Sequence, residues 1–127
     1  MDREISEVLS SQICQFRAVA LLGPRQAGKT YILNKVINEL GGSLLSLDDP
    51  LIRDELNSDP VRALRHYYKN GPLVIDEAAK VPFVFDALKI LIDEKGLNPS
   101  QICIANSGNY LLMKQIRESL AGRVHLA

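Results

Sequence analysis

The chain has 127 residues, of which 46% are hydrophobic and 24% charged, and its 15 basic and 15 acidic side chains give a formal net charge of zero. This size fits a single domain spanning residues 1–127, and the even charge balance gives no indication of a polyanionic partner such as nucleic acid. No apolar run approaches the ~20 residues of a membrane-spanning helix, so we expect no membrane association.

The first half of the chain alternates between helical and strand patterns. Apolar residues recur at helical spacing over 4–16, and the short unbroken apolar run 17–22 indicates a buried strand. After a glycine-rich turn, a second helical stripe covers 32–40 and stops at a pair of glycines. The run 43–47 then predicts a second strand.

The second half continues this alternation. Asp49-Pro50 and Asp59-Pro60 each combine a helix N-cap with a proline at the first helical position, so they predict two short helices. Further helical stripes span 81–92 and 111–120. The remaining strands are expected at 73–76, 102–105 and 123–127, the last of which has barely begun where the sequence ends.

Short apolar strands that alternate with helices predict a three-layer α/β fold, in which helices cover both faces of a mostly parallel sheet. If the fifth strand is truncated, we expect an open sheet edge or exposed apolar surface beside it, and hence poor solubility. The longest basic cluster has the spacing of one helix face and favours solvated surface over a binding patch. It consists of Arg62, Arg65, His66 and Lys69.

The two cysteines, Cys14 and Cys103, lie far apart among apolar neighbours, and no metal-ligand spacing exists. We expect both to be buried free thiols in a reducing compartment, and a disulfide between them is the less favoured alternative. The N-terminal segment is acidic and has no long apolar core, so we expect no signal peptide. Together these features predict a cytoplasmic protein.

The stretch GPRQAGKT, residues 23–30, matches the phosphate-binding pattern G-x-x-x-x-G-K-[ST] between a strand and a helix. Its glycines let successive backbone N–H groups converge, and the helix start adds unpaired donors and a positive dipole end. We expect Lys29 to reach the β- and γ-phosphates and Thr30 to ligate magnesium; a turn that binds nothing is the alternative. The expected nucleotide-binding residues are Gly23, Pro24, Arg25, Gln26, Ala27, Gly28, Lys29, Thr30 and Tyr31.

An acidic pair follows the third apolar strand, as Asp76 and Glu77. Ligand chemistry in parallel sheets gathers at the carboxyl ends of the strands, so Asp76 is expected to face the same crevice as the glycine turn. Asp76 suits a magnesium-bound water, and Glu77 suits the general base that polarises attacking water. The alternative is a strand that ends in two solvated acids.

These motifs, with SLDDP (46–50), VIDEAAKVP (74–82) and ESLAGRV (118–124), resemble the prokaryotic AAA-type ATPases whose phosphate loop reads GPRQxGKT. That family lies in the additional-strand, catalytic-glutamate division of P-loop NTPases. The resemblance covers nearly the whole chain and implies ATP, Mg²⁺ and the strand order 5-1-4-3-2. It also implies self-assembly into a homo-oligomer, by analogy alone. The guanine signature Asn-Lys-x-Asp is absent, since Val36-Ile37 follows Asn34-Lys35.

Three features depart from the family's pattern. Ala79 stands where relatives often carry glutamine, and Ala105 occupies the usual polar sensor position at the end of the fourth strand. Asn106 is the first candidate to replace that sensor by contacting the γ-phosphate or the water; Ser107, Asn109 or a plain polar turn are the alternatives. The sequence also ends before the lid and C-terminal domain of relatives, so we expect an incomplete domain.

Arg123 resembles the arginine of the family's Ala-Gly-Arg motif, which would neutralise transition-state charge in cis or across a subunit boundary. A surface pair with Glu118 or an aspartate is the alternative. Arg25 is similarly open between phosphate contact and solvent. Asp48 and Asp49 are expected to cap the next helix, although the resemblance allows a role near the crevice.

The predicted function is therefore magnesium-dependent ATP binding with weak hydrolysis. The expected catalytic residues are Lys29, Glu77, Asn106 and Arg123, and the expected metal ligands are Thr30 and Asp76. The missing lid and altered sensor leave a non-catalytic nucleotide-responsive protein, or a degenerate truncated ATPase, as the alternative. A small-molecule kinase is disfavoured because no acceptor site or arginine-rich lid is recognisable. No pattern identifies a protein client.

Overall fold

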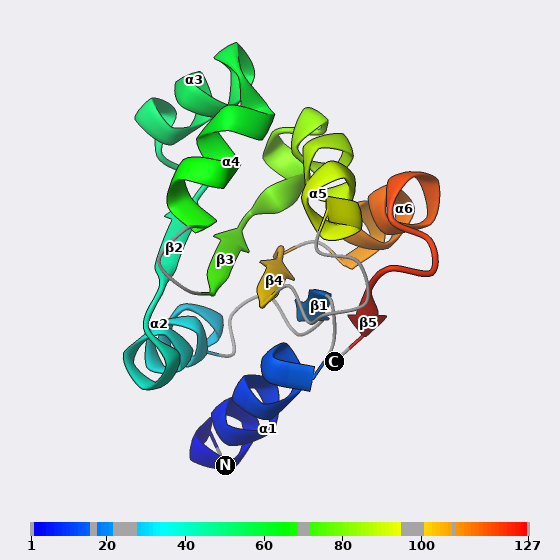
Figure 1. Ribbon diagram of the computed structural model, residues 1–127. Coiled ribbons are helices and arrows are strands. Elements are labelled where there is room, and N and C mark those ends of the chain that lie inside the picture. Colours follow the sequence, from blue (N-terminus) through cyan, green and yellow to red (C-terminus); the bar gives the residue numbers. More distant parts are fainter. Residues whose placement is uncertain are drawn as a thin grey trace.

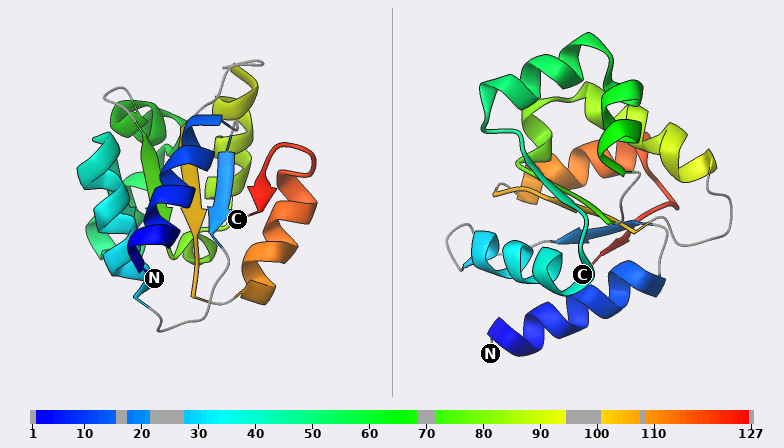
Figure 2. Two further views of the ribbon diagram at one scale, coloured as in Figure 1. Left: turned by 90° about the horizontal axis from the view of Figure 1, so that it is seen from below. Right: turned by 60° about the vertical axis from the view of Figure 1, so that its left-hand side comes forward.

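A parallel sheet lies between two layers of helices in the computed structural model, which describes residues 2–15, 18–21, 28–68, 72–94, 101–107 and 109–126. Figures 1 and 2 show α1 (Asp2–Gln15) and α2 (Lys29–Leu40) on one face of the sheet. The other face is covered by α3 (Pro50–Ser58), α4 (Pro60–Tyr68), α5 (Phe83–Glu94) and α6 (Asn109–Ser119). The strands are β1 (Ala18–Leu21), β2 (Ser43–Ser46), β3 (Leu73–Asp76), β4 (Ile102–Ala105) and β5 (His125–Leu126). The predicted three-layer α/β fold is confirmed.

The five strands are ordered β2-β3-β4-β1-β5, and every neighbouring pair is parallel. This is the predicted order 5-1-4-3-2 read from the other edge. The register pairs Leu21 with Ala105, and Ser46 with Asp76, so the strands end level with their neighbours. The carboxyl ends of β1, β4, β3 and β2 therefore form one edge, at which loop residues from distant parts of the chain meet.

The core lies on both faces of the sheet because successive strand side chains point to opposite sides. In β1, Ala18 and Ala20 belong to the cluster under α3 to α6, whereas Val19 belongs to the cluster under α1 and α2. Phe85 of α5 is the largest fully buried side chain of the first cluster. Burying each Leu, Ile or Phe contributes about 1.5–3 kcal/mol relative to exposure, so both helical layers are held by the sheet.

The helix boundaries follow the expected caps. Asp49 accepts a 2.9 Å hydrogen bond from the backbone N–H of Leu51, and Asp59 accepts one of 3.2 Å from Arg62. The stripe expected over 81–92 starts two residues later, at Phe83, because a separate 3₁₀ turn, Ala78–Lys80, precedes it. That turn was not predicted.

The two cysteines differ in exposure. Cys103 is a buried free thiol in β4, as expected, and burial together with the charge of Asp76 raises its pKa to about 12. Cys14 is also free, but it is exposed, so its predicted burial is wrong. It follows the fully buried Ile13 on α1, and the next position of a helix points about 100° away, toward solvent.

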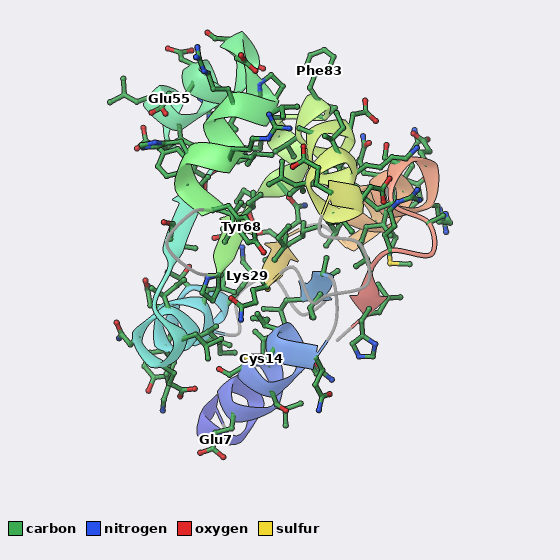
Figure 3. The ribbon with its side chains drawn as sticks, in the orientation of Figure 1. Glu7, Cys14, Lys29, Glu55, Tyr68 and Phe83 are labelled. Atoms are coloured by element: carbon green, nitrogen blue, oxygen red, sulfur yellow. The ribbon has the colours of Figure 1, made fainter. Side chains whose placement is uncertain are left out.

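The surface agrees in part with the expectations. Arg62, Arg65 and His66 are exposed on α4, as a solvated face requires, and Lys69 lies outside the described residues. Leu126 of the edge strand β5 is 44% exposed, and Figure 3 shows Phe83, 65% exposed, projecting away from the core. None of the helices in the described ranges is long and apolar enough to cross a membrane. The cytoplasmic location stays a prediction.

Candidate nucleotide site

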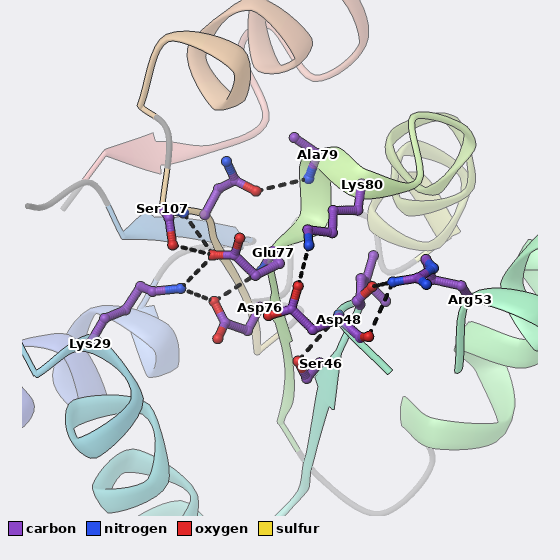
Figure 4. Close-up of polar contacts among 11 residues, drawn as sticks. Lys29, Ser46, Asp48, Arg53, Asp76, Glu77, Ala79, Lys80 and Ser107 are labelled. Carbon is purple, nitrogen blue, oxygen red and sulfur yellow. Dashed lines mark hydrogen bonds and ion pairs between the residues drawn. The ribbon is translucent and has the colours of Figure 1, made fainter. Parts of the chain in front are cut away.

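A cleft of about 490 Å³ opens at the carboxyl edge of the sheet. It is lined by Gly28, Lys29, Thr30, Asp48, Asp76, Glu77, Lys80 and Ser107. These residues come from the start of α2, from the last residue of β3 and from the segments that follow β2, β3 and β4 (Figure 4). The glycine turn and the acidic pair were predicted to share this edge, and the structure places Gly28 and the acidic pair in the same cleft.

The start of α2 presents backbone donors to this cleft. Gly28 has the left-handed backbone angles φ 73° and ψ 25°, and no side chain among the described residues caps the helix that follows. The first N–H groups of α2 are therefore available to an anion at the positive end of the helix dipole. The preceding loop residues Gly23, Pro24, Arg25, Gln26 and Ala27 lie outside the described residues, so their contacts stay predictions.

Two other predicted nucleotide contacts differ in position. Thr30 lines the cleft, as a magnesium ligand would have to. Tyr31 is 55% exposed and is not among the described lining residues. Its ring instead lies 5.8 Å from the ammonium of Lys35, one turn further along α2. A nucleotide contact by the side chain of Tyr31 stays a prediction.

Lys29 forms ion pairs with both acids of the predicted pair. Its ammonium contacts Oδ1 of Asp76 and lies 2.8 Å from Oε1 of Glu77. All three side chains are only 12–13% exposed. Burial lowers the pKa of Lys29, but hydrogen bonds and charge attraction from the two carboxylates outweigh it and leave the pKa above its ordinary value. Lys29 is therefore firmly protonated and offsets one of the two negative charges.

Glu77 adopts an unusual backbone conformation. Its angles, φ 56° and ψ 42°, lie in the left-handed region, which costs about 1–3 kcal/mol for a residue other than glycine. This conformation turns the chain from β3 into the 3₁₀ turn Ala78–Lys80. The Glu77 N–H also donates a 2.9 Å hydrogen bond to Oδ1 of Asp76. Such strain persists where the surroundings hold the residue, as they do here, and it often marks functional sites.

Ser107 holds the same oxygen of the Glu77 carboxylate that Lys29 contacts. Its backbone N–H and its hydroxyl donate to Oε1 of Glu77 over 2.8 and 2.5 Å. Burial raises the pKa of Glu77, but the hydrogen bonds from Lys29 and Ser107 reverse this effect and leave the pKa below its ordinary value. Glu77 is thus ionised at neutral pH, which is the state that a general base requires.

Asn106 has a different place from the predicted sensor. It is 5% exposed, and its Oδ1 accepts a 3.1 Å hydrogen bond from the N–H of Ala79. This contact ties the end of β4 to the 3₁₀ turn. Of the residues that follow β4, Ser107 and not Asn106 lines the cleft in the described part of the chain. A role of Asn106 at the γ-phosphate stays a prediction.

Arg123 is placed outside this group. Its Nε donates to Oδ1 of Asp93 over 2.9 Å, and its Nη2 lies 3.3 Å from the other carboxylate oxygen. It is not among the described residues that line the cleft. The pairing with an aspartate on the surface, the alternative from the sequence, is the arrangement that the structure has. A role across a subunit boundary stays a prediction.

Lys80 lines the cleft, although the sequence did not single it out. Asp48 was expected to cap the next helix, and that prediction was wrong. Asp49 alone caps α3, whereas Asp48 lines the cleft and forms an ion pair with Lys80. Asp48 comes shortly after β2 and Lys80 ends the turn after β3, so both follow adjacent strands. The predicted adjacency of these two strands was the signal that could have placed Asp48 and Lys80 in the same cleft.

The fold and the cleft define a class of protein. Three features are typical of a P-loop NTPase: a parallel sheet in this order, a helix that starts uncapped after a left-handed glycine, and a lysine beside two acids at the end of β3. A family model described as an AAA domain matches residues 15–127, and the chain belongs to this family of AAA-type P-loop proteins. Members of such a family bind nucleotides.

The chain is also similar to two curated mycobacterial proteins. It is 36% identical over 108 residues to an uncharacterized protein of Mycobacterium bovis and equally to an uncharacterized protein of Mycobacterium tuberculosis. Each match covers 85% of this chain but 24% of the relative, so the chain spans about a quarter of the length of these proteins. The similarity thus concerns one part of each of these longer proteins.

Proposed function

We propose that this chain binds ATP together with Mg²⁺ and hydrolyses it slowly, with Glu77 as the general base. The observation that carries this proposal is the convergence of Lys29, Asp76 and Glu77 in one cleft at the uncapped start of α2. Phosphate oxygens fit the free N–H groups of the helix start, and a water beside an ionised glutamate fits hydrolysis.

The donor set supports magnesium. The hydroxyl of Thr30 and the carboxylate of Asp76 are oxygen ligands, which Mg²⁺ prefers, and both line the cleft. No group of three or more His, Cys, Asp or Glu side chains within the described ranges is arranged to hold a metal by itself. Thr30 and Asp76 would hold a Mg²⁺ ion, and it would supply positive charge to the phosphates of a bound nucleotide.

Each residue of the cleft has its own role in the proposed reaction. Lys29 transfers its hydrogen bonds from the acids to phosphate oxygens, which leaves Asp76 for the metal. Glu77 remains held by Ser107, and it accepts the proton of the attacking water. Arg123 acts, in this proposal, only after it leaves Asp93, either within the chain or across a boundary between two copies.

Nucleotide titration tests the binding step. Lys29→Ala should weaken ATP affinity by about tenfold or more, because a charge-assisted contact is lost. Lys35→Ala is the matched control, since Lys35 also lies on α2 but contacts Tyr31. Equal ATP affinity of the wild type and Lys29→Ala would remove the argument for the cleft.

Turnover is tested separately by phosphate release. Glu77→Gln should keep ATP binding and abolish hydrolysis, because an amide cannot accept the proton. Turnover unchanged by this substitution would show that Glu77 is not the base.

A second candidate function is a nucleotide-responsive protein without catalysis. It is favoured by the contacts of Glu77, whose Oε1 already accepts bonds from Lys29 and Ser107, and by the use of Asn106 to hold Ala79. This alternative predicts ATP binding with no phosphate release by the wild type. Sedimentation with and without ATP would test the further proposal that nucleotide drives self-assembly.

A further inference from the structure

The geometry points to Lys80 as a second phosphate-binding cation of the cleft, which Asp48 holds aside until nucleotide enters. This inference rests on the proposed ATP binding and adds a determinant of selectivity to it. Lys80 is assigned to the terminal phosphate and thus to the distinction between ATP and ADP.

The backbone of Lys80 is fixed relative to the proposed base. Lys80 ends the 3₁₀ turn that begins after Glu77, and its N–H donates a 3.1 Å hydrogen bond to the carbonyl of Glu77. The middle residue of the turn, Ala79, is tied to Asn106. The Lys80 side chain is nonetheless 47% exposed, so its ammonium can move while its origin stays beside the base. In the proposed function the base acts at the terminal phosphate, and Lys80 is therefore assigned to that phosphate.

The backbone of Asp48 is fixed as well. The N–H of the preceding residue, Leu47, donates to the carbonyl of Asp76 over 3.0 Å, which extends the pairing of β2 with β3. Nη1 of Arg53 donates to the carbonyls of Leu47 and Asp48 over 2.8 and 3.1 Å. The carboxylate of Asp48 is 57% exposed at the rim of the cleft. An ion pair this exposed adds little to stability, so folding does not account for its position.

Carboxylates outnumber cations in the described lining of the cleft, so a bound triphosphate needs a further positive charge. The described lining carries the cations Lys29 and Lys80 and three carboxylates, Asp48, Asp76 and Glu77. Lys29 is already shared between the two acids beside it. Figure 4 draws Lys29 on one side of these acids and the pair of Lys80 with Asp48 on the other. Within the described lining, an incoming triphosphate thus gains a second cation by drawing Lys80 away from Asp48.

The experiment measures the affinity of a non-hydrolysable ATP analogue and of ADP, both with Mg²⁺. Lys80→Met should weaken the ATP analogue by about tenfold and ADP by less than about twofold. Asp48→Asn should tighten the ATP analogue by about threefold, because it removes a negative charge and releases Lys80. Both effects should shrink in 0.5 M salt, as expected for exposed charges.

The control is an ion pair of similar exposure outside the cleft. Arg65→Gln breaks the pair between Arg65 and Glu94, whose side chains are 55% and 44% exposed, and should leave both affinities unchanged. Equal weakening of the two nucleotides by Lys80→Met would overturn the inference, as would weakening by Asp48→Asn. A wild type that binds neither nucleotide would instead refute the proposed function. A wild type that binds both, with Lys80→Met unchanged, would refute only the role of Lys80.

Discussion

Lys29 at the start of α2 donates a 2.8 Å hydrogen bond to Oε1 of Glu77, although 48 positions separate the two residues in the sequence. The same ammonium contacts Asp76, so one cation is shared between two adjacent and nearly buried carboxylates. A nucleotide therefore has to take Lys29 away from partners that it already satisfies. The contact that assembles the cleft also competes with phosphate.

Lys29→Ala should destabilise the nucleotide-free protein. It leaves two neighbouring carboxylates, each 12–13% exposed, without their cation. The expected loss is about 1–3 kcal/mol of unfolding free energy at pH 7, measured by urea denaturation. Adding Asp76→Asn should recover part of that loss. Arg65→Gln, which breaks an exposed ion pair, should cost less than about 1 kcal/mol. Equal costs for the two single substitutions would contradict this reading of the buried pair.

The same contacts predict how stability depends on pH. The folded-state pKa of Glu77 is lowered, so its contribution is present above the ordinary value of 4.5 and is lost as the pH falls through the lowered pKa. The folded-state pKa of Lys29 is raised, so its contribution is present below 10.5 and is lost as the pH rises through the raised pKa. Denaturation curves of Glu77→Gln should show a smaller loss of stability at acidic pH than those of the wild type.

Ser107→Ala should change the pH profile of turnover rather than nucleotide affinity. The substitution removes the hydroxyl bond to Glu77 and keeps the bond from the backbone N–H. The pKa of Glu77 should then rise toward its ordinary value, and the acidic limb of the kcat profile should move to higher pH. Ser58→Ala is a suitable control because the Ser58 hydroxyl donates to a carbonyl within α3. An unmoved acidic limb would show that Ser107 does not position the base.

Gly42→Ala should destabilise the protein more than Gly41→Ala. Both glycines have a positive φ, 99° and 76°, so both substitutions carry a backbone penalty of about 1–2 kcal/mol. A Cβ at Gly42 would also lie 2.1 Å from the carbonyl oxygen of Pro72, whereas nothing lies within 4 Å at Gly41. We expect an additional cost of at least about 1 kcal/mol in urea denaturation. Similar losses of unfolding free energy for the two variants would mean that the backbone at Pro72 shifts easily to make room for the Cβ.

Arg123→Ala should leave the folded chain nearly as stable as the wild type, because its partner Asp93 is 47% exposed. If Arg123 acts on a neighbouring copy, this variant and Glu77→Gln should each be inactive, and a mixture should regain phosphate release. The mixture places an intact arginine beside an intact base. Activity of Arg123→Ala alone at the wild-type rate would remove Arg123 from the catalytic residues.

The fold was predictable because its signals are local. The strand 73–76 was predicted with the correct limits, since three apolar residues follow Gly-Pro and run into the acidic pair Asp76 and Glu77. The N-cap at Asp49 was likewise correct. Cys14 was assigned to the core because its neighbours are apolar, but neighbours in a helix point in different directions. Burial at a single helical position depends on which way the side chain points around the helix axis, and the composition of its neighbours does not determine that direction.

The site was predictable in its members but not in their contacts. The strand ends brought Lys29, Asp76 and Glu77 to one edge, as the topology requires. The direct pairing of Lys29 with the acids was not predicted, because the motif describes a lysine bound to phosphate. The left-handed Glu77 was missed too, since a glutamate has no local preference for that conformation. The pair of Asp48 and Lys80 depends on two turns whose shapes the sequence does not specify.

The level ends of the strands have a consequence for the whole molecule. The cleft is lined by segments that begin at Gly28, Asp48, Asp76 and Ser107. No single segment forms the site, so the site exists only once the strands of the sheet have paired. A ligand that bridges these segments would bind the folded chain and not the unfolded one, and mass action would then favour folding. A bound nucleotide would therefore hold together segments from the first and last thirds of the chain.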